Sequence, residues 1–466
     1  MPDVMQAQAE DVFVASFREL EKKLARTEPP WLRQAREEAI LRFAELGFPT
    51  TRQEEWKYTN VSPIAKIPFQ PASYEDSVGK DSPSLRDLES ALWVDAECSR
   101  LVFVNGYFSE ALSCLEGLPA GVQAGPLTAA LDGADGGSLE EHLGRYADFR
   151  HHPFVALNTA SWLDGVFVRI APGTVLEKPI HLVFAASSGG PPVVSHPRTL
   201  IIAERDTQAT FTESYFGWGE GVCFSNAVTE IRAGENAVID HYKLQLENER
   251  SYHLGTLSVR QDRSANFSSC SISFGGHLAR NEVVAVLDAE GADCALNGLY
   301  LARGRQHVDN YTTIDHAKPH GTSNQFYKGI LDGHSAGVFH GRIIVRKDAQ
   351  KTDAVQKNKN LLLSEDAVVD TKPQLEIFAN DVRCTHGATV GQIDPEALFY
   401  LCSRGVGSRE ARALLTYAFA GDILDRIRLA PFRACLEGSL QARLARNIRE
   451  TIAAPATKET NLQEAP

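Results

Sequence analysis

The stretch from about Phe154 to Gly391 constrains the fold most, because short strand-like runs alternate there with small, similar corners. Runs rich in Val, Ile, Phe and Thr include residues 166–170 (VFVRI), 199–203 (TLIIA), 282–287 (EVVAVL) and 342–346 (RIIVR). The corners carry Gly, Asp, Asn or Ala, as in residues 233–237 (AGENA) and 290–292 (EGA). None of the connections is long enough for a crossover helix, so a dinucleotide-binding α/β sheet is excluded.

Two all-β architectures remain, a sandwich and a stacked solenoid. Apolar residues at alternating positions and the repeated corners favour the solenoid, in which each coil hydrogen-bonds to the next and inward Val, Ile and Leu side chains form one core. Burying one such side chain contributes roughly 1.5–3 kcal/mol, so many coils are needed. We therefore expect a mainly β protein with a parallel β-helix core over residues 151–393.

A mixed, partly helical region is expected before this core, over residues 1–150. Residues 31–46 (WLRQAREEAILRFAEL) place apolar side chains on one helical stripe, and Gly47 and Pro49 follow as stop signals. Residues 101–104 (LVFV) predict a strand that ends at the turn Asn105-Gly106.

Helices are expected after the core, over residues 394–452. Asp394 is predicted to cap a first helix, with Pro395 as its first residue. Ser408 is predicted to cap a second helix, which has an apolar face from Ala411 to Ile423. A third, more charged helix spans about residues 433–452, and the last residues, 453–466, have the composition of a disordered tail.

Charge and hydropathy exclude several classes of protein. The 466-residue chain has a formal net charge of −13, so phosphates would be repelled and a nucleic-acid partner is disfavoured. The N-terminus lacks the basic and apolar segments of a secretory signal, and no apolar run reaches the roughly 18–20 residues of a membrane helix. These features predict a cytoplasmic protein without a membrane partner.

Familiar catalytic and metal-binding signatures are missing from the sequence. The eight cysteines are scattered without a C-x-x-C pair, so they form neither a disulfide framework nor a self-contained zinc or iron–sulfur cage. There is no G-x-x-x-x-G-K-[ST] phosphate loop, no G-x-S-x-G elbow and no H-E-x-x-H motif. We expect a chain that does not bind ATP through a phosphate loop of its own.

One pair of residues is suited to a metal. Cys384 and His386 stand two apart at the end of a strand-like segment, so they should project from the same face while Thr385 points the other way. A soft sulfur beside an imidazole suits iron, zinc or copper. Two ligands do not complete a site, so the remaining ligands must come from elsewhere in the fold, from solvent or from another protein.

A second group of histidines is a weaker candidate for a metal site. It comprises His307, His316, His320, His334 and His340, and their spacing matches no known tetrahedral set. Histidines stacked along a solenoid commonly serve as hydrogen-bonded ladder residues, and we favour that role here.

Four stretches of sequence resemble a known family. Residues 350–364 (QKTDAVQKNKNLLLS), 370–394 (DTKPQLEIFANDVRCTHGATVGQID) and 398–405 (LFYLCSRG) closely resemble the SufB/SufD family of the SUF iron–sulfur cluster assembly machinery, and residues 54–60 (EEWKYTN) are similar to its early motif. Within that family the SufD type fits better, because Gly387 follows the histidine where SufB-like chains carry an acidic residue, and residues 366–370 contain no cysteine.

The resemblance implies a fold and a role. It implies a right-handed parallel β-helix between helical regions, pairing through the β-helix with a SufB-like paralogue. The C-terminal helices would dock on SufC, an ABC-type ATPase, with contact candidates at Arg404, Arg409, Arg412, Leu415, Tyr417 and Phe419. The chain itself would be a non-catalytic structural subunit in the building and transfer of nascent clusters. It would have no permanently bound cofactor, and ATP would act only through SufC.

At the paralogue interface the resemblance implies a transient iron–sulfur cluster. His386 is the histidine that the family implicates there, with Cys384 beside it as a second candidate or as a core thiol. The sequence leaves open whether a flavin binds the complex and whether the isolated chain forms a homodimer.

A rival function comes from enzymes of the same architecture. Parallel β-helices also serve as polysaccharide lyases and hydrolases, with carboxylates and basic residues along one groove. Asp309, Asp315, Lys318 and Arg342 could take such roles. Enzymes of that kind are usually exported, which the N-terminus of this chain does not predict.

Overall fold

The computed structural model of the chain describes residues 2–24, 28–78, 83–91, 99–133, 136–187 and 189–453. The chain divides into two compact units, Met1–Gly391 and Gln392–Pro466. With 41% strand and 27% helix the protein is mainly β, and its core is a parallel β-solenoid of about eight turns. The predicted fold class is therefore confirmed.

The described strands all lie in the first unit. They are β1 (Gln70–Pro71), β2 (Ser99–Val104), β3 (Tyr107–Phe108), β4 (Val122–Pro126), β5 (Gly165–Ile170), β6 (Ile180–Ser187), β7 (Val193–Ser195), β8 (Arg198–Ala203), β9 (Gln208–Trp218), β10 (Cys223–Ala233), β11 (Val238–Leu246), β12 (Tyr252–Gln261), β13 (Asn266–Ser273), β14 (Leu278–Leu287), β15 (Asp293–Ala302), β16 (His307–His316), β17 (Thr322–Leu331), β18 (Ala336–Val345), β19 (Asp353–Leu362), β20 (Val368–Ile377) and β21 (Arg383–Gly391).

Helices occur in both units. Those of the first unit are α1 (Pro2–Leu24), α2 (Pro30–Leu46), α3 (Ser62–Lys66), α4 (Tyr74–Val78), α5 (Leu85–Ala91), α6 (Leu127–Asp132), α7 (Gly136–His142) and α8 (Pro153–Ser161), with the short 3₁₀ helices η1 (Glu54–Trp56) and η2 (Glu110–Leu112). Those of the second unit are α9 (Pro395–Ser403), α10 (Ser408–Leu424) and α11 (Ala430–Ala453).

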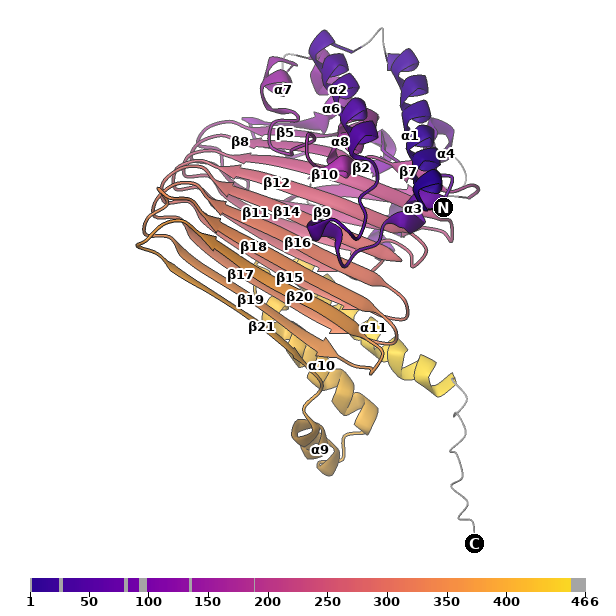
Figure 1. The fold of residues 1–466 in the computed structure, drawn as a ribbon, viewed down its shortest axis with the longest axis vertical. Coiled ribbons are helices and arrows are strands. Elements are labelled where there is room, and N and C mark those ends of the chain that lie inside the picture. Colours follow the sequence, from indigo (N-terminus) through magenta and orange to yellow (C-terminus); the bar gives the residue numbers. More distant parts are fainter. Residues whose placement is uncertain are drawn as a thin grey trace. The chain divides into compact units, whose positions relative to one another are not determined.

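Successive strands of the solenoid alternate between two sheets. Sheet A has the order β20-β18-β16-β14-β12-β10-β8-β5-β4, and sheet B has the order β21-β19-β17-β15-β13-β11-β9-β6-β2-β3. Figure 1 shows the strands as stacked rungs whose colour runs from magenta to orange along the stack. Each coil contributes one strand to each sheet, so every interior strand pairs in parallel with the coil before it and the coil after it.

The corners repeat because their backbones bond to one another. Asn236, Ser264, His320 and Lys351 take positive φ angles of 54–63° at the same corner of four coils, and Gly291 takes a φ of 74° at this corner of the coil between Ser264 and His320. Asn236 N donates to Arg263 O at 2.9 Å, and His320 N donates to Gln350 O at 2.9 Å. The backbone donor of each tight corner is thus satisfied by a carbonyl oxygen of the next coil, which explains why the sequence shows similar short turns between strands.

The interior of the solenoid has two different halves. One half is an aliphatic cluster that includes Val259, Val283, Ile314 and Ile343. The other half is lined by buried polar side chains, from Glu213 and Lys243 in the early coils to Gln356 and Asn360 in the late ones. The sequence had suggested Val, Ile and Leu at the inward positions, but in one half of the interior these positions carry polar side chains.

The N-terminal region packs on the outer face of sheet A. Phe154 of α8 contacts Phe224 of β10 at 6.3 Å between ring centroids, and Phe43 of α2 belongs to the same cluster. The EEWKYTN segment is anchored nearby, because the Arg280 guanidinium lies 4.0 Å from the centre of the Trp56 ring. Figure 1 shows α2 and α8 beside these strands. The helix predicted at residues 31–46 is present as α2, which ends at Gly47 with a φ of 63°.

The second unit contains the three predicted helices. Asp394 caps α9 by accepting a hydrogen bond from Glu396 N at 2.9 Å, as expected. The predicted cap of α10 is wrong, because Gly407 and not Ser408 occupies that position. The predicted tail at 453–466 lies outside the described residues from position 454 onward. Among the described residues, no helix combines the length and apolar character needed to cross a membrane.

Candidate functional site

The last coil of the solenoid carries the metal-ligand pair predicted from the sequence. β21 stands at one end of sheet B, and β20 stands at the corresponding end of sheet A. Among the described strands, β21 pairs with β19 alone, placing Cys384 beside Ala354 and His386 beside Gln356. One edge of each terminal strand therefore lacks a neighbouring strand in the described chain, which leaves backbone groups available for a further strand.

Burial along β19 shows which way the pair projects. Ala354 and Gln356 are completely buried and face the solenoid interior, while Lys357 on the opposite face of the strand is exposed. Cys384 and His386 stand at the matching positions of β21, so both project from its inward face, as the sequence spacing predicted. Cys384 is half-buried and packs on the aliphatic cluster. His386 is exposed at the open edge.

The two side chains differ in their readiness to bind a metal. Burial raises the pKa of the Cys384 thiol above its ordinary value, and the nearby Asp353 carboxylate adds to the rise. At neutral pH the sulfur therefore keeps its proton, and a metal or a partner cation must displace that proton before it can ligate. His386 is exposed, and the ring nitrogens of an imidazole are common metal ligands.

Within the part of the chain that the structure describes, the pair does not make a complete metal site. No group of three or more His, Cys, Asp or Glu side chains suited to a metal occurs among the described residues. The exposed position of His386 at an unpaired sheet edge allows a second polypeptide to supply further ligands. Whether His386 and Cys384 act as ligands stays a prediction.

The other histidines are dispersed rather than assembled. His316 is buried and bonds Ser323 Oγ at 2.9 Å, while His340 lies 3.3 Å from Gln374 Oε1. His307 lies 3.0 Å from Thr59 Oγ1. His320 and His334 are exposed at corners, near separate carboxylates. His307, His316 and His340 are therefore hydrogen-bonded side chains, whereas the ladder role stays a prediction for His320 and His334.

Three of the four residues considered for glycan chemistry form ion pairs. Asp309 is buried, pairs with Arg280 and accepts a hydrogen bond from Thr59 Oγ1 at 2.6 Å. Asp315 pairs with Arg346 at 2.6 Å. Arg342 pairs with Glu376 at 2.7 Å, and Lys318 is exposed on a corner. Two unengaged carboxylates facing one groove, as a glycosidase requires, are not found in this set.

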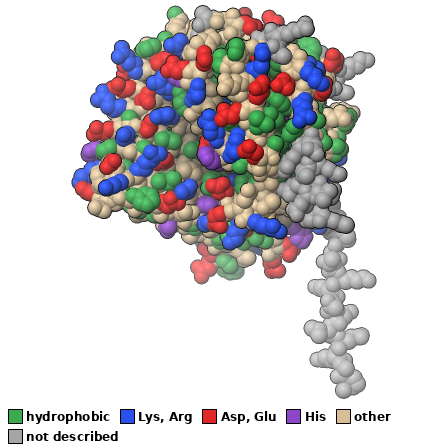
Figure 2. Space-filling model, turned by 45° about the horizontal axis from the view of Figure 1, so that its top comes forward, with side chains coloured by type: hydrophobic (Ala, Val, Ile, Leu, Met, Phe, Trp, Pro, Cys, Tyr) green, Lys and Arg blue, Asp and Glu red, His purple; other side chains and the backbone are tan. Residues whose placement is uncertain are grey.

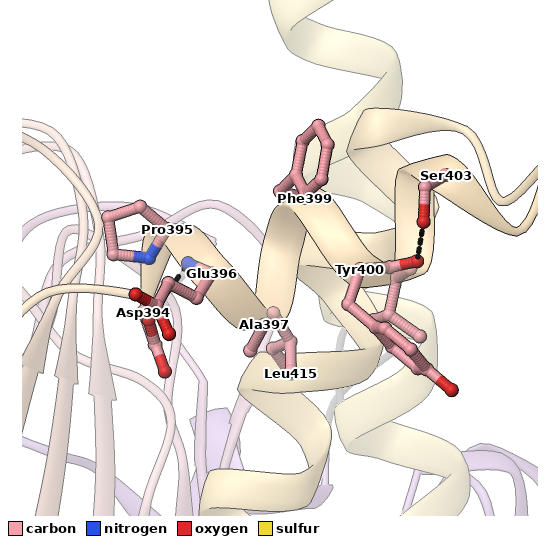
Figure 3. A pocket seen from close by; sticks show the side chains of 9 residues that line it. Asp394, Pro395, Glu396, Ala397, Phe399, Tyr400, Ser403 and Leu415 are labelled. Carbon is pink, nitrogen blue, oxygen red and sulfur yellow. Dashed lines mark hydrogen bonds between the residues drawn. The ribbon is translucent and has the colours of Figure 1, made fainter.

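A second candidate surface lies within the C-terminal unit. An open groove of about 820 Å³ is lined by nine residues of α9, α10 and the cap of α9 (Figure 3): Asp394, Pro395, Glu396, Ala397, Phe399, Tyr400, Leu401, Ser403 and Leu415. Phe399 is 74% exposed and Tyr400 is 58% exposed. Exposed aromatic side chains around a concavity, with acidic residues at one end, are typical of a protein-docking surface.

The six docking candidates named from the sequence fall at different places around α9 and α10. Leu415 lines the groove, and the Arg404 guanidinium lies 5.1 Å from the centre of the Tyr400 ring. Arg409 and Arg412 are exposed, whereas Tyr417 and Phe419 are half-buried. Sequence reasoning missed Phe399 and Tyr400, although the run LFYL places adjacent large apolar residues on a helix too short to bury them all.

Comparisons with known proteins agree with these features. The family model for the SufBD protein N-terminal region matches residues 7–182, and the model for the SufBD core domain of SUF system FeS cluster assembly matches residues 184–419. An iron–sulfur cluster assembly SufBD family protein of Synechocystis is 35% identical over 425 residues, which cover 90% of this chain and 92% of the relative.

Two further relatives carry the name iron–sulfur cluster assembly protein SufD. The relative from Escherichia coli is 31% identical over 389 residues, which cover 82% of this chain and 86% of the relative. The relative from Bacillus subtilis is 24% identical over 411 residues, which cover 86% of this chain and 91% of the relative.

Proposed function

Because the chain belongs to the SufBD family of iron–sulfur cluster assembly proteins, we propose that it is a structural, non-catalytic subunit of a cluster-building complex. It pairs through its solenoid with a SufB-like paralogue and through its C-terminal helices with a SufC-like ABC ATPase. A nascent cluster forms at the interface with the paralogue, as cargo of the complex and not as a resident cofactor of this chain.

One observation carries the proposal: His386 projects from the inward face of the last solenoid strand, at a sheet edge without a further strand in the described chain. A strand of the paralogue can extend the sheet there through main-chain hydrogen bonds. The surrounding apolar side chains support such pairing, since Val390 and Val368 are 48% and 56% exposed. Phe378, just beyond β20, is 63% exposed.

The ligand chemistry of Cys384 and His386 suits a cluster that is bound only transiently and then released. His386 contributes a neutral nitrogen donor, which binds iron less firmly than a thiolate does. Because the pKa of the Cys384 thiol is raised, its sulfur binds only when the metal displaces the thiol proton. We propose that the remaining ligands come from the paralogue, so that the cluster is completed by two polypeptides and released when they separate.

ATP acts through the partner and not through this chain. The groove between α9 and α10 supplies the docking site for the ATPase, with Phe399 and Tyr400 as apolar anchors and Arg404 beside them. Aromatic and arginine side chains carry most of the binding energy at protein interfaces. We propose that a rearrangement driven by ATP is transmitted from this dock to the paralogue interface.

The charge distribution supports protein partners over nucleic acid. Figure 2 shows Lys and Arg side chains interspersed with Asp and Glu over the face that it presents. Together with the net charge of −13, this pattern leaves no positive field for phosphates on that face. We propose that the complex works in the cytoplasm.

Co-expression with a SufB-like and a SufC-like protein tests the proposal. We expect affinity capture of this chain to retain both partners through size-exclusion chromatography, as one complex with a defined mass. Elution of this chain separately from both partners, in the presence and in the absence of ATP, contradicts the proposal.

A further inference from the structure

A row of buried amide side chains crosses the polar half of the solenoid interior and ends beneath the open edge. It begins at Thr312 of β16, whose Oγ1 is the partner of Gln325 Nε2 from β17. Gln325 Oε1 in turn accepts a hydrogen bond from Gln356 Nε2 of β19 at 2.6 Å. All three side chains are completely buried. Each amide thus donates its NH₂ group to the side chain before it in the row, so the carbonyl oxygen of Gln356 is the last acceptor of the row.

The last oxygen of this row lacks a partner. Gln356 Oε1 is buried and makes no hydrogen bond among the described residues. Buried polar oxygens in folded proteins almost always accept a hydrogen bond, so an orphan at this place indicates a donor that arrives from the next position. The fold also makes room for the amide, because a Cβ atom at Gly341 would lie 2.3 Å from Gln356 Nε2.

The next position in the row belongs to His386. It is the register partner of Gln356 on the adjacent strand and projects from the same inward face. Neighbouring strands lie about 4.8 Å apart, so side chains at paired positions are within hydrogen-bonding reach. We propose that Gln356 is a positioning residue for His386: its Oε1 accepts the N–H of the imidazole, so that the other ring nitrogen presents its lone pair at the open edge.

This inference rests on the proposed function, because it explains how an imidazole at a sheet edge is prepared for a metal. A histidine ligand usually donates its second ring N–H to a carbonyl or carboxylate, which fixes the tautomer and the ring orientation. Here the acceptor is the side-chain carbonyl of Gln356, within the core. The orientation of the whole row matters, since an amide turned the other way would present NH₂ and select the opposite tautomer.

Nitrogen NMR of the isolated full-length chain tests the inference without any metal. Histidine ring ¹⁵N signals are recorded at about pH 8.5, where an ordinary imidazole is neutral, and the His386 signals are assigned by their loss in His386→Ala. We expect one dominant tautomer in the unmodified chain and a mixture in Gln356→Met, which keeps the side-chain length without the acceptor. Gln356→Glu, which retains an acceptor oxygen, should restore the single tautomer.

Two further variants separate positioning from general disruption. Gly341→Ala leaves the acceptor in the chain but displaces the amide, and it should also give a mixture of tautomers. Gln374→Met is the matched control, because Gln374 lies on the outward face of β20, where it donates to Glu376 Oε1 at 2.7 Å. It should leave the His386 signals unchanged. If Gln356→Met does not fold, Gly341→Ala carries the test.

The outcomes distinguish this inference from the proposed function. An unchanged single tautomer in both Gln356→Met and Gly341→Ala overturns the positioning role, even if His386→Ala abolishes iron binding by the complex. A tautomer that responds to Gln356 while His386→Ala leaves the iron content unchanged supports the positioning contact and overturns the metal role.

Discussion

Phe399→Ser should weaken binding of the SufC-like ATPase without destabilising the chain. The phenyl ring is 74% exposed beside the groove of the C-terminal unit. Fully burying a Phe side chain contributes roughly 1.5–3 kcal/mol, so burying the exposed three quarters of this ring on docking should contribute about 1–2 kcal/mol. The dissociation constant should therefore rise ~5- to 30-fold. The free energy of unfolding should change by less than about 0.5 kcal/mol, because little of the ring is buried in the chain itself.

Isothermal titration calorimetry with the purified ATPase measures the first effect, and urea unfolding measures the second. Leu41→Ser is the matched control, since Leu41 is 64% exposed on α2, outside the groove. It removes a similar exposed apolar side chain and should leave the affinity unchanged. Equal affinities for the unmodified chain and Phe399→Ser, or equal losses in both variants, would refute the assignment of the groove as the dock.

Other consequences concern the edge, the core and acid stability. Val390→Lys places a charge at the open edge, so it should abolish association with the SufB-like paralogue in size-exclusion chromatography while the melting temperature changes little. Glu230→Gln should lower the free energy of unfolding by roughly 3–5 kcal/mol, because it leaves the buried Arg198 guanidinium without its counter-charge; a loss below about 1 kcal/mol would contradict this account of the pair. Burial lowers the pKa of His196 from 6.5 to about 3, so the unfolded chain takes up a proton before the folded chain as the pH falls. The free energy of unfolding should therefore decline below pH 6.5. When it is measured by urea unfolding at a series of pH values, His196→Gln should reduce its dependence on pH by up to about 1.4 kcal/mol per pH unit.

The solenoid could be predicted from the sequence because its two signals are local. Runs rich in Val, Ile and Phe indicate strands such as β18, and the corner residues Asn236 and Ser264 mark where the backbone takes positive φ. Both signals act within a few residues. The cap of α10 was predicted wrongly, because Gly407 and Ser408 are both acceptable cap residues and only the path of the backbone distinguishes them.

The polar interior could not be predicted from alternation. In β19 the inward residues Gln356 and Asn358 are as polar as the outward Lys357 and Lys359, so the strand shows no contrast between its faces. Only the register with neighbouring coils shows that the amides are buried and bonded to one another. The amide row beneath His386 was missed for this reason.

The aromatic groove was missed for a different physical reason. The sequence correctly placed a helix over Phe399, but the exposed side of a helix depends on which neighbours cover it. Periodicity also predicted one apolar face from Ala411 to Ile423, whereas Leu414 is 53% exposed and Ala411 is buried. Exposed apolar side chains of this kind follow from tertiary packing, which a single sequence does not encode locally.

The iron and sulfide content of the co-purified complex tests the central claim most directly. The claim is that His386, at the open edge of the solenoid, helps to hold a nascent cluster that two polypeptides complete together. Complexes containing the unmodified chain, His386→Ala and the control Thr385→Ala, whose side chain projects from the opposite face of β21, are purified without oxygen and compared. We predict cluster loss in His386→Ala at unchanged subunit stoichiometry and normal cluster content in Thr385→Ala. Equal iron and sulfide in all three complexes would contradict the account.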